Sequence, residues 1–278
     1  MSLTIFGIVL AAAALHALWN AVVKGASDTL LTTILVAGFG GLIGAVVLPF
    51  LTPVAAPAWL YLCISGVLEI IYYALIAFAY RHADMSHAYP LMRGIPPLLV
   101  AVVSASVLGT TLGVLQWTGV ALISAGILTM LLGLRGHHGD RKGLGFALLN
   151  ALVIGSYTLT DGLGVRVAGS PIAYTMWIFV LTGAPLVAWA LLRRPQIVAY
   201  ARRNWAYGLV GGIGTLGSYG LVLFAMTDAP IPLVAALRET SIVFGTLIAV
   251  FVLKEKVTAL RIAAAVIIAA GVIALRLS

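Results

Sequence analysis

The sequence predicts an all-α polytopic membrane protein whose ten transmembrane helices form two inverted five-helix repeats. Hydrophobic residues make up 62% of the 278 residues and charged residues only 9%, whereas a soluble domain has about 45–50% and about 25%. Ten apolar runs are each long enough to cross a bilayer, which takes about 20 residues. An internal repeat relates the first five runs to the last five. This composition excludes a soluble enzyme, a nucleic-acid-binding domain and a disordered tail.

The apolar runs define the expected helices in order along the chain. The first run has no basic segment before it and no cleavage site of small residues at its end, so we interpret it as a helix and not as a signal peptide. The single cysteine, Cys63, excludes an internal disulfide framework and a cysteine-based zinc site. The expected spans cover residues 3–24, 29–50, 57–80, 84–108, 112–134, 143–162, 171–192, 205–226, 230–253 and 257–277.

Basic residues concentrate in the loops that follow odd-numbered helices. Those loops and the start of the last helix carry Lys24, Arg81, Arg135, Arg141, Lys142, Arg193, Arg194, Arg202, Arg203, Lys254, Lys256 and Arg261. The opposite side has Arg166 and Arg276. Since cytoplasmic loops are enriched in Lys and Arg, we expect the odd-numbered loops in the cytoplasm and both termini outside, in the inner (cytoplasmic) membrane. A soluble partner for the net charge of +8 is the alternative; no nucleic-acid partner is expected.

The two halves of the chain resemble each other. At a shift of 145 residues Arg93 falls on Arg238 and Gly126 on Gly271, and at a shift of 146 Tyr73 falls on Tyr219. We therefore expect one repeat over residues 1–135 and a second over residues 143–278. Five helices per repeat turn the second repeat upside down in the membrane. Inverted repeats typically hold a transport site between them at the membrane midplane.

The end of each repeat carries a family resemblance. The segment FVLKEKVTALRIAAAVIIAAGVIAL at 251–275 resembles the end of an EamA repeat of the drug/metabolite transporter superfamily, with Glu255, Thr258 and Gly271 at the family's Glu, Thr and Gly positions. The first half ends similarly over 103–128, but Thr110 occupies the acidic position. The resemblance implies a ten-helix metabolite carrier, usually an exporter, and does not define the substrate.

Four full charges fall within the expected spans: Glu69, Arg93, Arg238 and Glu239. Each costs about 2.5–3.5 kcal/mol at mid-helix on insertion scales, so we expect them to face the interior, where they sum to zero. The aspartates are expected at helix ends or in loops. Arg238 and Glu239 are not expected to pair with each other, because neighbours on a helix point about 100° apart.

Helical spacing groups polar and aromatic residues with these charges. Glu69, Tyr72 and Tyr73 share one face of the third span, and other spans contribute similar faces. A cavity with aromatic walls and a few fixed charges is typical of small-molecule sites. The predicted substrate-binding residues are His16, Trp19, Asn20, Glu69, Tyr72, Tyr73, Arg93, Tyr157, Tyr219 and Arg238.

The charges suggest a zwitterionic substrate. Arg93 or Arg238 would hold a carboxylate, since guanidinium binds planar anions through two hydrogen bonds. Glu69, with aromatic rings nearby, would bind an amine through charge and cation–π contact. The alternative is that Glu69–Arg93 and the second-half charges are buried ion pairs that only fix helix packing.

Prolines interrupt the fourth and ninth spans, where they remove backbone donors. A hinge beside the site and a tolerated kink are the two interpretations. The predicted hinge residues are Pro90, Pro96, Pro97, Pro230 and Pro232.

These observations predict a secondary transporter that moves a small polar, amino-acid-like metabolite by alternating access, most simply as an exporter. The alternative is an importer of a small polar or cationic nutrient such as choline. An intramembrane enzyme is not expected, because the chain has no H-E-x-x-H motif. We expect no cofactor and no metal site, with His137, His138 and Asp140 interpreted as a solvated loop. Besides the substrate and the lipid bilayer we expect no obligate partner, so the chain is a monomer, with a homodimer as the alternative.

Overall fold

The computed structural model describes residues 1–23, 26–83, 85–133, 141–252, 254 and 258–278, and all the regular elements among them are helices. The helices are α1 (Leu3–Val23), α2 (Thr29–Val47), α3 (Ala58–His82), α4 (Met85–Gly94), α5 (Pro96–Ser106), α6 (Val114–Thr129), α7 (Arg141–Val167), α8 (Pro171–Arg193), α9 (Ile197–Asp228), α10 (Ile231–Arg238), α11 (Ser241–Leu247) and α12 (Ala259–Arg276). Short turns at Leu48–Phe50, Met130–Gly133 and Ile248–Val252 extend α2, α6 and α11. In the described residues these elements form ten spans long and apolar enough to cross a membrane, which confirms the predicted fold class.

The fourth and ninth expected spans are each broken in two. The fourth consists of α4 and α5, which are separated at Ile95, and the ninth of α10 and α11, which are separated at Glu239 and Thr240. Ile95 and Thr240 differ by 145 residues, the shift that relates the two repeats. The two breaks are therefore equivalent positions of the repeat. Both lie next to an arginine, Arg93 in α4 and Arg238 in α10.

Helix packing shows the twofold relation between the halves. Exchanging the halves turns α1 into α7, α3 into α9 and α6 into α12. The contact of α3 with α7 then becomes the contact of α9 with α1, while α2 with α8 and α6 with α12 map onto themselves, and all four are extensive contacts of the bundle. Each of these contacts joins a helix of one half to a helix of the other. The inverted repeat therefore intertwines its halves rather than placing them side by side.

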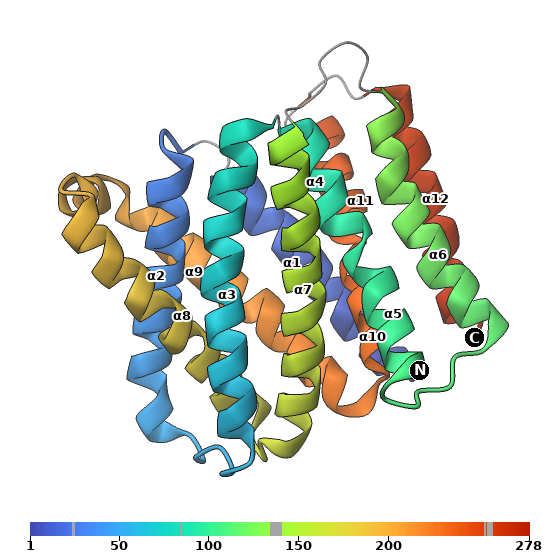
Figure 1. Ribbon diagram of the computed structural model, residues 1–278, viewed down its shortest axis with the longest axis horizontal. Coiled ribbons are helices and arrows are strands. Elements are labelled where there is room, and N and C mark those ends of the chain that lie inside the picture. The colour runs from blue at the N-terminus through green and yellow to red at the C-terminus, as the bar shows by residue number, and fades with distance from the viewer. Residues whose placement is uncertain (24–25, 84, 134–140, 253, 255–257) are drawn as a thin grey trace.

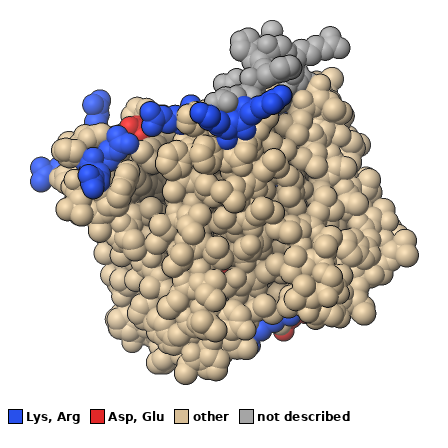
Figure 2. All heavy atoms as spheres, in the orientation of Figure 1, with Lys and Arg blue, Asp and Glu red and all other residues tan. Residues whose placement is uncertain are grey.

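The chain ends and loops confirm the inversion. Both termini lie at the lower end of the bundle in Figure 1, and α1 and α7 begin at opposite ends. Basic side chains gather along the upper end, where the loops after odd-numbered spans lie, as Figure 2 shows. Of the residues named above, Lys24, Arg135, His137, His138, Asp140, Glu255 and Lys256 lie outside the described residues.

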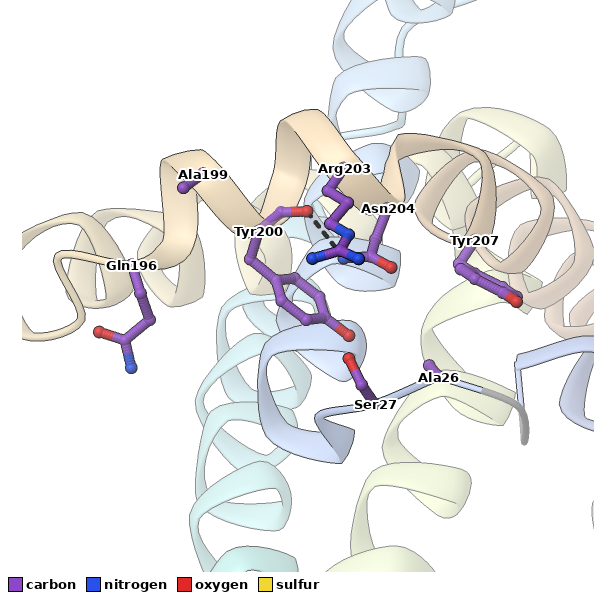
Figure 3. A pocket seen from close by; sticks show the side chains of 8 residues that line it. All are labelled: Ala26, Ser27, Gln196, Ala199, Tyr200, Arg203, Asn204 and Tyr207. Atoms are coloured by element: carbon purple, nitrogen blue, oxygen red, sulfur yellow. Dashed lines mark hydrogen bonds between the residues drawn. The ribbon is translucent and has the colours of Figure 1, made fainter.

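Two expected spans are longer than predicted. The span expected at 143–162 is α7, which runs from Arg141 to Val167, and the one expected at 205–226 is α9, which starts at Ile197. Asn204 interrupts α9 with non-helical angles, φ −119° and ψ 20°. The part of α9 before this kink crosses the end of the bundle above residues 26 and 27 (Figure 3). The extra turns of α7 move its polar residues away from the helix end.

Glycines allow a close helix contact between the halves where α6 crosses α12. A Cβ on Gly271 of α12 would lie 2.8 Å from the carbonyl oxygen of Gly119 in α6. A Cβ on its repeat partner Gly126 would lie 3.1 Å from the carbonyl oxygen of Ala264 in α12. Small residues at such crossings let membrane helices pack backbone against backbone.

We expect Gly271→Ala to destabilise the fold by about 1–3 kcal/mol, because the added methyl meets backbone atoms that cannot move aside. Thermal unfolding in detergent measures this. Gly145→Ala in α7 is the matched control, since nothing lies within 4 Å of a Cβ there, and it should leave stability unchanged or raise it slightly. Equal melting temperatures for the two variants would contradict the close crossing.

Candidate functional site

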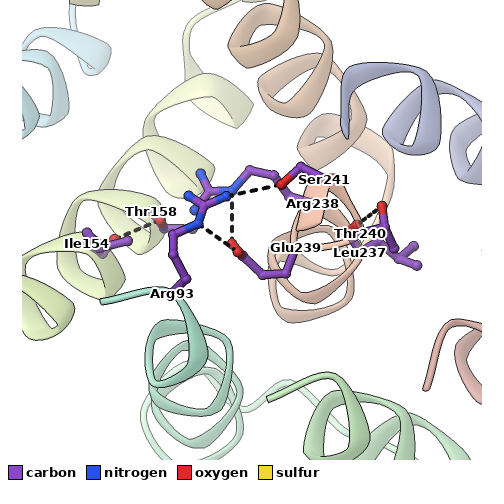
Figure 4. Close-up of polar contacts among 8 residues, drawn as sticks. All are labelled: Arg93, Ile154, Thr158, Leu237, Arg238, Glu239, Thr240 and Ser241. Atoms are coloured by element: carbon purple, nitrogen blue, oxygen red, sulfur yellow. Dashed lines mark hydrogen bonds and ion pairs between the residues drawn. The ribbon is translucent and has the colours of Figure 1, made fainter. Parts of the chain in front are cut away.

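A carboxylate from one half joins two arginines at the centre of the bundle. The carboxylate of Glu239 lies 2.9 Å from Nε of Arg93 and 3.5 Å from Nε of Arg238. Figure 4 shows the three side chains converging from α4 and from the break between α10 and α11, with Ser241 beside them. The side chain of Glu239 is 1% exposed, and that of Arg93 14%. The two repeat-related arginines thus share a single buried counter-ion.

This contact corrects two expectations. Arg238 and Glu239 do pair, although neighbours on a regular helix point apart. The helix ends here: the N–H of Glu239 donates to the carbonyl of Ala236 in a tighter turn, and the long Arg238 side chain can fold back over it. The Glu69–Arg93 pair of the alternative interpretation is not formed in the structure; the acid that contacts Arg93 is Glu239.

Carboxyl groups form a second polar cluster, to which α3 of the first half and α7, α8 and α9 of the second half contribute. An oxygen of Glu69 in α3 accepts a hydrogen bond of 2.9 Å from the hydroxyl of Thr182 in α8. Asp161 of α7 accepts one of 3.0 Å from the phenol of Tyr174, and its other oxygen accepts from Tyr219. Asp161 is fully buried. Neither carboxylate contacts an arginine in these bonds.

Asp161 is not among the residues predicted to bind substrate, because every aspartate was expected at a helix end or in a loop. That expectation was wrong, because α7 continues to Val167 and Asp161 lies more than a turn inside it. The signal was present in the spacing of Asn150, Tyr157 and Asp161, which share one helical face. With Asp161 included, three carboxyl groups face two arginines, and the interior charges no longer sum to zero.

Aromatic rings connect the helices around the carboxyl groups. Ring centroids are 5.1 Å apart for Tyr72 and Tyr73, 5.8 Å for Tyr72 and Tyr157, and 6.5 Å for Tyr157 and Tyr219. Phe179 of α8 continues the series at 6.4 Å from Tyr219. These spacings are typical of edge-to-face aromatic pairs. Four of the predicted binding residues therefore form one continuous aromatic wall contributed by α3, α7 and α9.

The arginine cluster (Arg93, Arg238 and Glu239) and the carboxyl cluster (Glu69 and Asp161) belong to one site. Glu69 lies within electrostatic range of both Asp161 and Arg238. Tyr157 lies within range of Arg93 as well as Glu69. Positive and negative centres are therefore neighbours across the tyrosines, in the region where α3 and α7 pack against each other and α9 against α7.

Helix α1 supplies the remaining predicted residues at the edge of this site. His16 lies within electrostatic range of Arg93 and Arg238, and its ring contacts that of Trp19 at 5.4 Å. The buried indole N–H of Trp19 has no hydrogen-bond acceptor among the described residues. Asn20 is exposed, and its amide donates to the carbonyl of His16, 2.7 Å away. The structure thus groups His16 and Trp19 with the charges and turns the Asn20 amide back onto its own helix.

Three of the five predicted hinge prolines lie at or near the first break, and the other two lie at the opposite end of α10 from the second break. Pro90 lies inside α4 and Pro96 and Pro97 begin α5, while Pro230 and Pro232 lie at the start of α10. Whether these residues bend during function stays a prediction, as does substrate binding by the ten residues named from the sequence. Among the described residues no cluster of three or more potential metal ligands occurs.

Comparison with known proteins assigns the family. Residues 141–277 match the EamA-like transporter family. The chain carries an EamA-like transporter repeat. It is a multi-pass membrane protein of the drug/metabolite transporter superfamily, whose EamA-like members are transporters and not enzymes. The resemblance drawn from residues 251–275 is thereby confirmed.

The fold extends the match to the whole chain. A solved protein described only as a crystal structure is 21% identical and superposes with a TM-score of 0.75, over 99% of this chain and 96% of that one. At this identity the likeness concerns the fold. A comparison with curated protein sequences found no match. The EamA-like chain thus shares its complete ten-span architecture with a known structure.

We expect Glu239→Gln to destabilise this EamA-like fold by about 3 kcal/mol, because it leaves two buried guanidinium groups without a counter-ion. Thermal or denaturant unfolding of the purified protein measures the change. Glu69→Gln is the comparison, since among the described residues Glu69 accepts one hydrogen bond, from Thr182, and the amide oxygen can still accept it.

A double variant separates charge from packing. Arg93→Gln added to Glu239→Gln removes one of the orphaned charges and should restore part of the lost stability. A double variant that is less stable than Glu239→Gln alone would show that the side chains matter through their shape and not through their charge.

Proposed function

We propose that this EamA-like protein is a secondary transporter that moves a small, polar, amino-acid-like metabolite by alternating access, and that it works as an exporter. The observation that carries the proposal is the pairing of opposite charge centres across an aromatic wall. Arg93 and Arg238 share only one carboxylate, while Glu69 and Asp161 have only hydroxyl donors as direct partners among the described residues. Such a site complements a molecule that carries both an anion and an amine.

The anion of the substrate would compete with Glu239. A guanidinium group binds a carboxylate best through two parallel hydrogen bonds, whereas Glu239 contacts each arginine through Nε. A substrate carboxylate could therefore engage the terminal nitrogens of one arginine without displacing Glu239 from the other. The two arginines, which share the single negative charge of Glu239, would then have a second negative charge beside them.

The amine of the substrate would bind among the carboxyls and tyrosines. Tyr72, Tyr157 and Tyr219 present rings close to Glu69 and Asp161, and an ammonium group gains both charge pairing and cation–π attraction there. A net surplus of acid in the interior favours a positive partner. This surplus also supports the second candidate, uptake of a cationic nutrient such as choline.

The halves would move relative to each other by bending at the breaks between α4 and α5 and between α10 and α11. The bundle is tied across the halves by α2 with α8 and α6 with α12. The two breaks lie beside Arg93 and Arg238, and Pro96 and Pro97 follow the first of them. We propose that α5 and α10, which contact each other, tilt about these breaks to open one end of the site at a time. The repeats proposed for this motion are residues 1–135 and 143–278. Ten spans enclose the site within one chain, so we propose a monomer, with a homodimer as the alternative.

Counterflow in proteoliposomes tests the substrate class. Vesicles loaded with an unlabelled amino acid should accumulate its labelled form, across a panel that includes choline and other quaternary amines. Arg93→Gln and Glu69→Gln should each lower the initial rate at least tenfold, because a hydrogen bond to a charged group contributes about 1.5–3 kcal/mol.

Arg141→Gln is the matched control for charge loss, since this arginine is exposed at the end of the bundle, and its rate should equal that of the native chain. Full transport by both site variants would leave Arg93 and Glu69 a packing role only. Accumulation of a quaternary amine, with no amino acid exchanged, would instead support the second candidate.

We also propose that the protein lies in the inner membrane with its odd-numbered loops in the cytoplasm. The basic end of the bundle supports this orientation (Figure 2). A reporter that is active only outside the cytoplasm, fused after Ser278, should be active, and the same reporter inserted at position 138 should be silent. The reverse pattern would overturn the orientation.

A further inference from the structure

A cavity of about 500 Å³ opens at the basic end of the bundle, away from the central site. It is lined by Ala26, Ser27, Gln196, Ala199, Tyr200, Arg203, Asn204 and Tyr207. Figure 3 shows these residues on the first part of α9 and on the segment before α2, with Arg203 and Asn204 directed toward Ser27. Most of the polar lining groups can donate hydrogen bonds, and Arg203 adds a full positive charge.

The segment around this cavity is basic and amphipathic. Residues 189–207 contain four arginines and no acidic residue. Arg202 and Arg203 are exposed, and the guanidinium carbon of Arg194 lies 5.8 Å from the centre of the Trp189 ring. Exposed arginines are too costly to place in hydrocarbon. This part of α9 therefore lies at the boundary between membrane and water.

Apolar side chains beside the cavity face outward. Val198 is 48% exposed and Trp205 56% exposed, and Trp at this depth is typical of the membrane interface. Ile197 instead is buried and packs in a small core with Leu31, Ile34 and Ala190. The segment is thus anchored to the bundle on one side and offers an apolar surface to acyl chains on the other.

The shape of the cavity is held by the neighbouring helix. The Tyr200 hydroxyl lies 2.6 Å from that of Thr32 and donates to the backbone carbonyl of Asp28 at 3.3 Å. The Asp28 carboxylate, the acidic group next to the cavity, already caps α2 by accepting from the N–H of Leu31. The Asn204 amide donates to the carbonyl of Tyr200 at the kink. The nearby acid is therefore committed to α2, and Arg203 has no ion pair among the described residues.

We propose that this cavity binds the headgroup of one anionic phospholipid of the cytoplasmic leaflet. The phosphate would lie against Arg203, with Ser27, Asn204 and Tyr207 within the same cavity as hydrogen-bonding groups. The acyl chains would run down the outer surface past Val198 and Trp205. A bound lipid would fasten the first part of α9 to the start of α2, and these two helices contact each other along the bundle. The site is independent of the substrate proposed above.

Native mass spectrometry of the purified full chain, titrated with phosphatidylglycerol or phosphatidylcholine, tests the proposal. We expect one phosphatidylglycerol to bind saturably, and phosphatidylcholine to bind at least fivefold more weakly. Arg203→Gln should weaken phosphatidylglycerol binding about fivefold, the effect of one basic residue at an anionic surface. Arg141→Gln removes an exposed charge from the same end of the bundle and should change the affinity less than twofold.

Tyr207→Phe provides a variant that keeps every charge and removes one hydroxyl from the lining; it should also weaken binding, with an unchanged melting temperature in the absence of lipid. Equal losses in Arg203→Gln and Arg141→Gln would overturn the site, because they would show diffuse attraction to a basic surface. Inorganic phosphate that displaces the lipid at comparable concentration would overturn the lipid assignment in favour of a free anion. Transport of the native chain need not be known for any of these results.

Discussion

The cost of a charge in the membrane interior governs the centre of this protein. An unpaired ion there is far less stable than one in water, and the described residues bring two guanidinium and three carboxyl groups together at this centre. Glu239 is the counter-ion of two arginines at once, one from each half. Because Arg93 belongs to α4 and Arg238 to α10, this single carboxylate links the two broken spans across the axis that relates the repeats. The two breaks lie beside it, and α5 packs against α10 next to them.

Much of the fold could be predicted because membrane insertion imposes a simple pattern. Ten apolar runs, the loop charges and the repeat of Arg93 at Arg238 were readable from the sequence, and the helices follow them. The ends of the helices could be predicted less well from the sequence. Apolar content cannot show that α7 continues past Asp161, since a helix persists through polar residues wherever the bundle buries them. For the same reason the first part of α9, rich in arginine, looked like a loop.

The structure brings together most of the residues named from the sequence, but it pairs their charges differently than expected. Helical spacing correctly grouped Tyr72 and Tyr73 with Glu69, because one regular helix carries all three. Pairing depends on the relation between helices that are distant in sequence, and spacing within a helix says nothing about it. Arg93 could be matched with Glu69 or with Glu239 on equal grounds. The contact of Arg238 with Glu239 was excluded by assuming a continuous helix, and the break at that point invalidates the assumption.

The repeat divides the site into a symmetric and an asymmetric part. The arginines, the breaks at Ile95 and Thr240, and the glycines of α6 and α12 each have a counterpart in the other half. The turns before α6 and α12 do too, since Gly109 and Lys254, also 145 residues apart, both have positive φ, 66° and 52°. The carboxyl groups do not: Glu239 corresponds to Gly94, and Glu69 to Thr215.

This division matches two different tasks. Elements that must behave alike when either end of the bundle opens need a partner in the inverted half, and the breaks and crossings have one. A site that distinguishes the two ends of its cargo must itself lack that symmetry. The carboxyl groups, which have no counterpart in the other half, provide the difference: the proposed zwitterion would have one preferred orientation, whereas a symmetric site would accept it either way round. The loss of repeat symmetry at the carboxyl groups is therefore what a carrier of a polar, two-ended molecule requires.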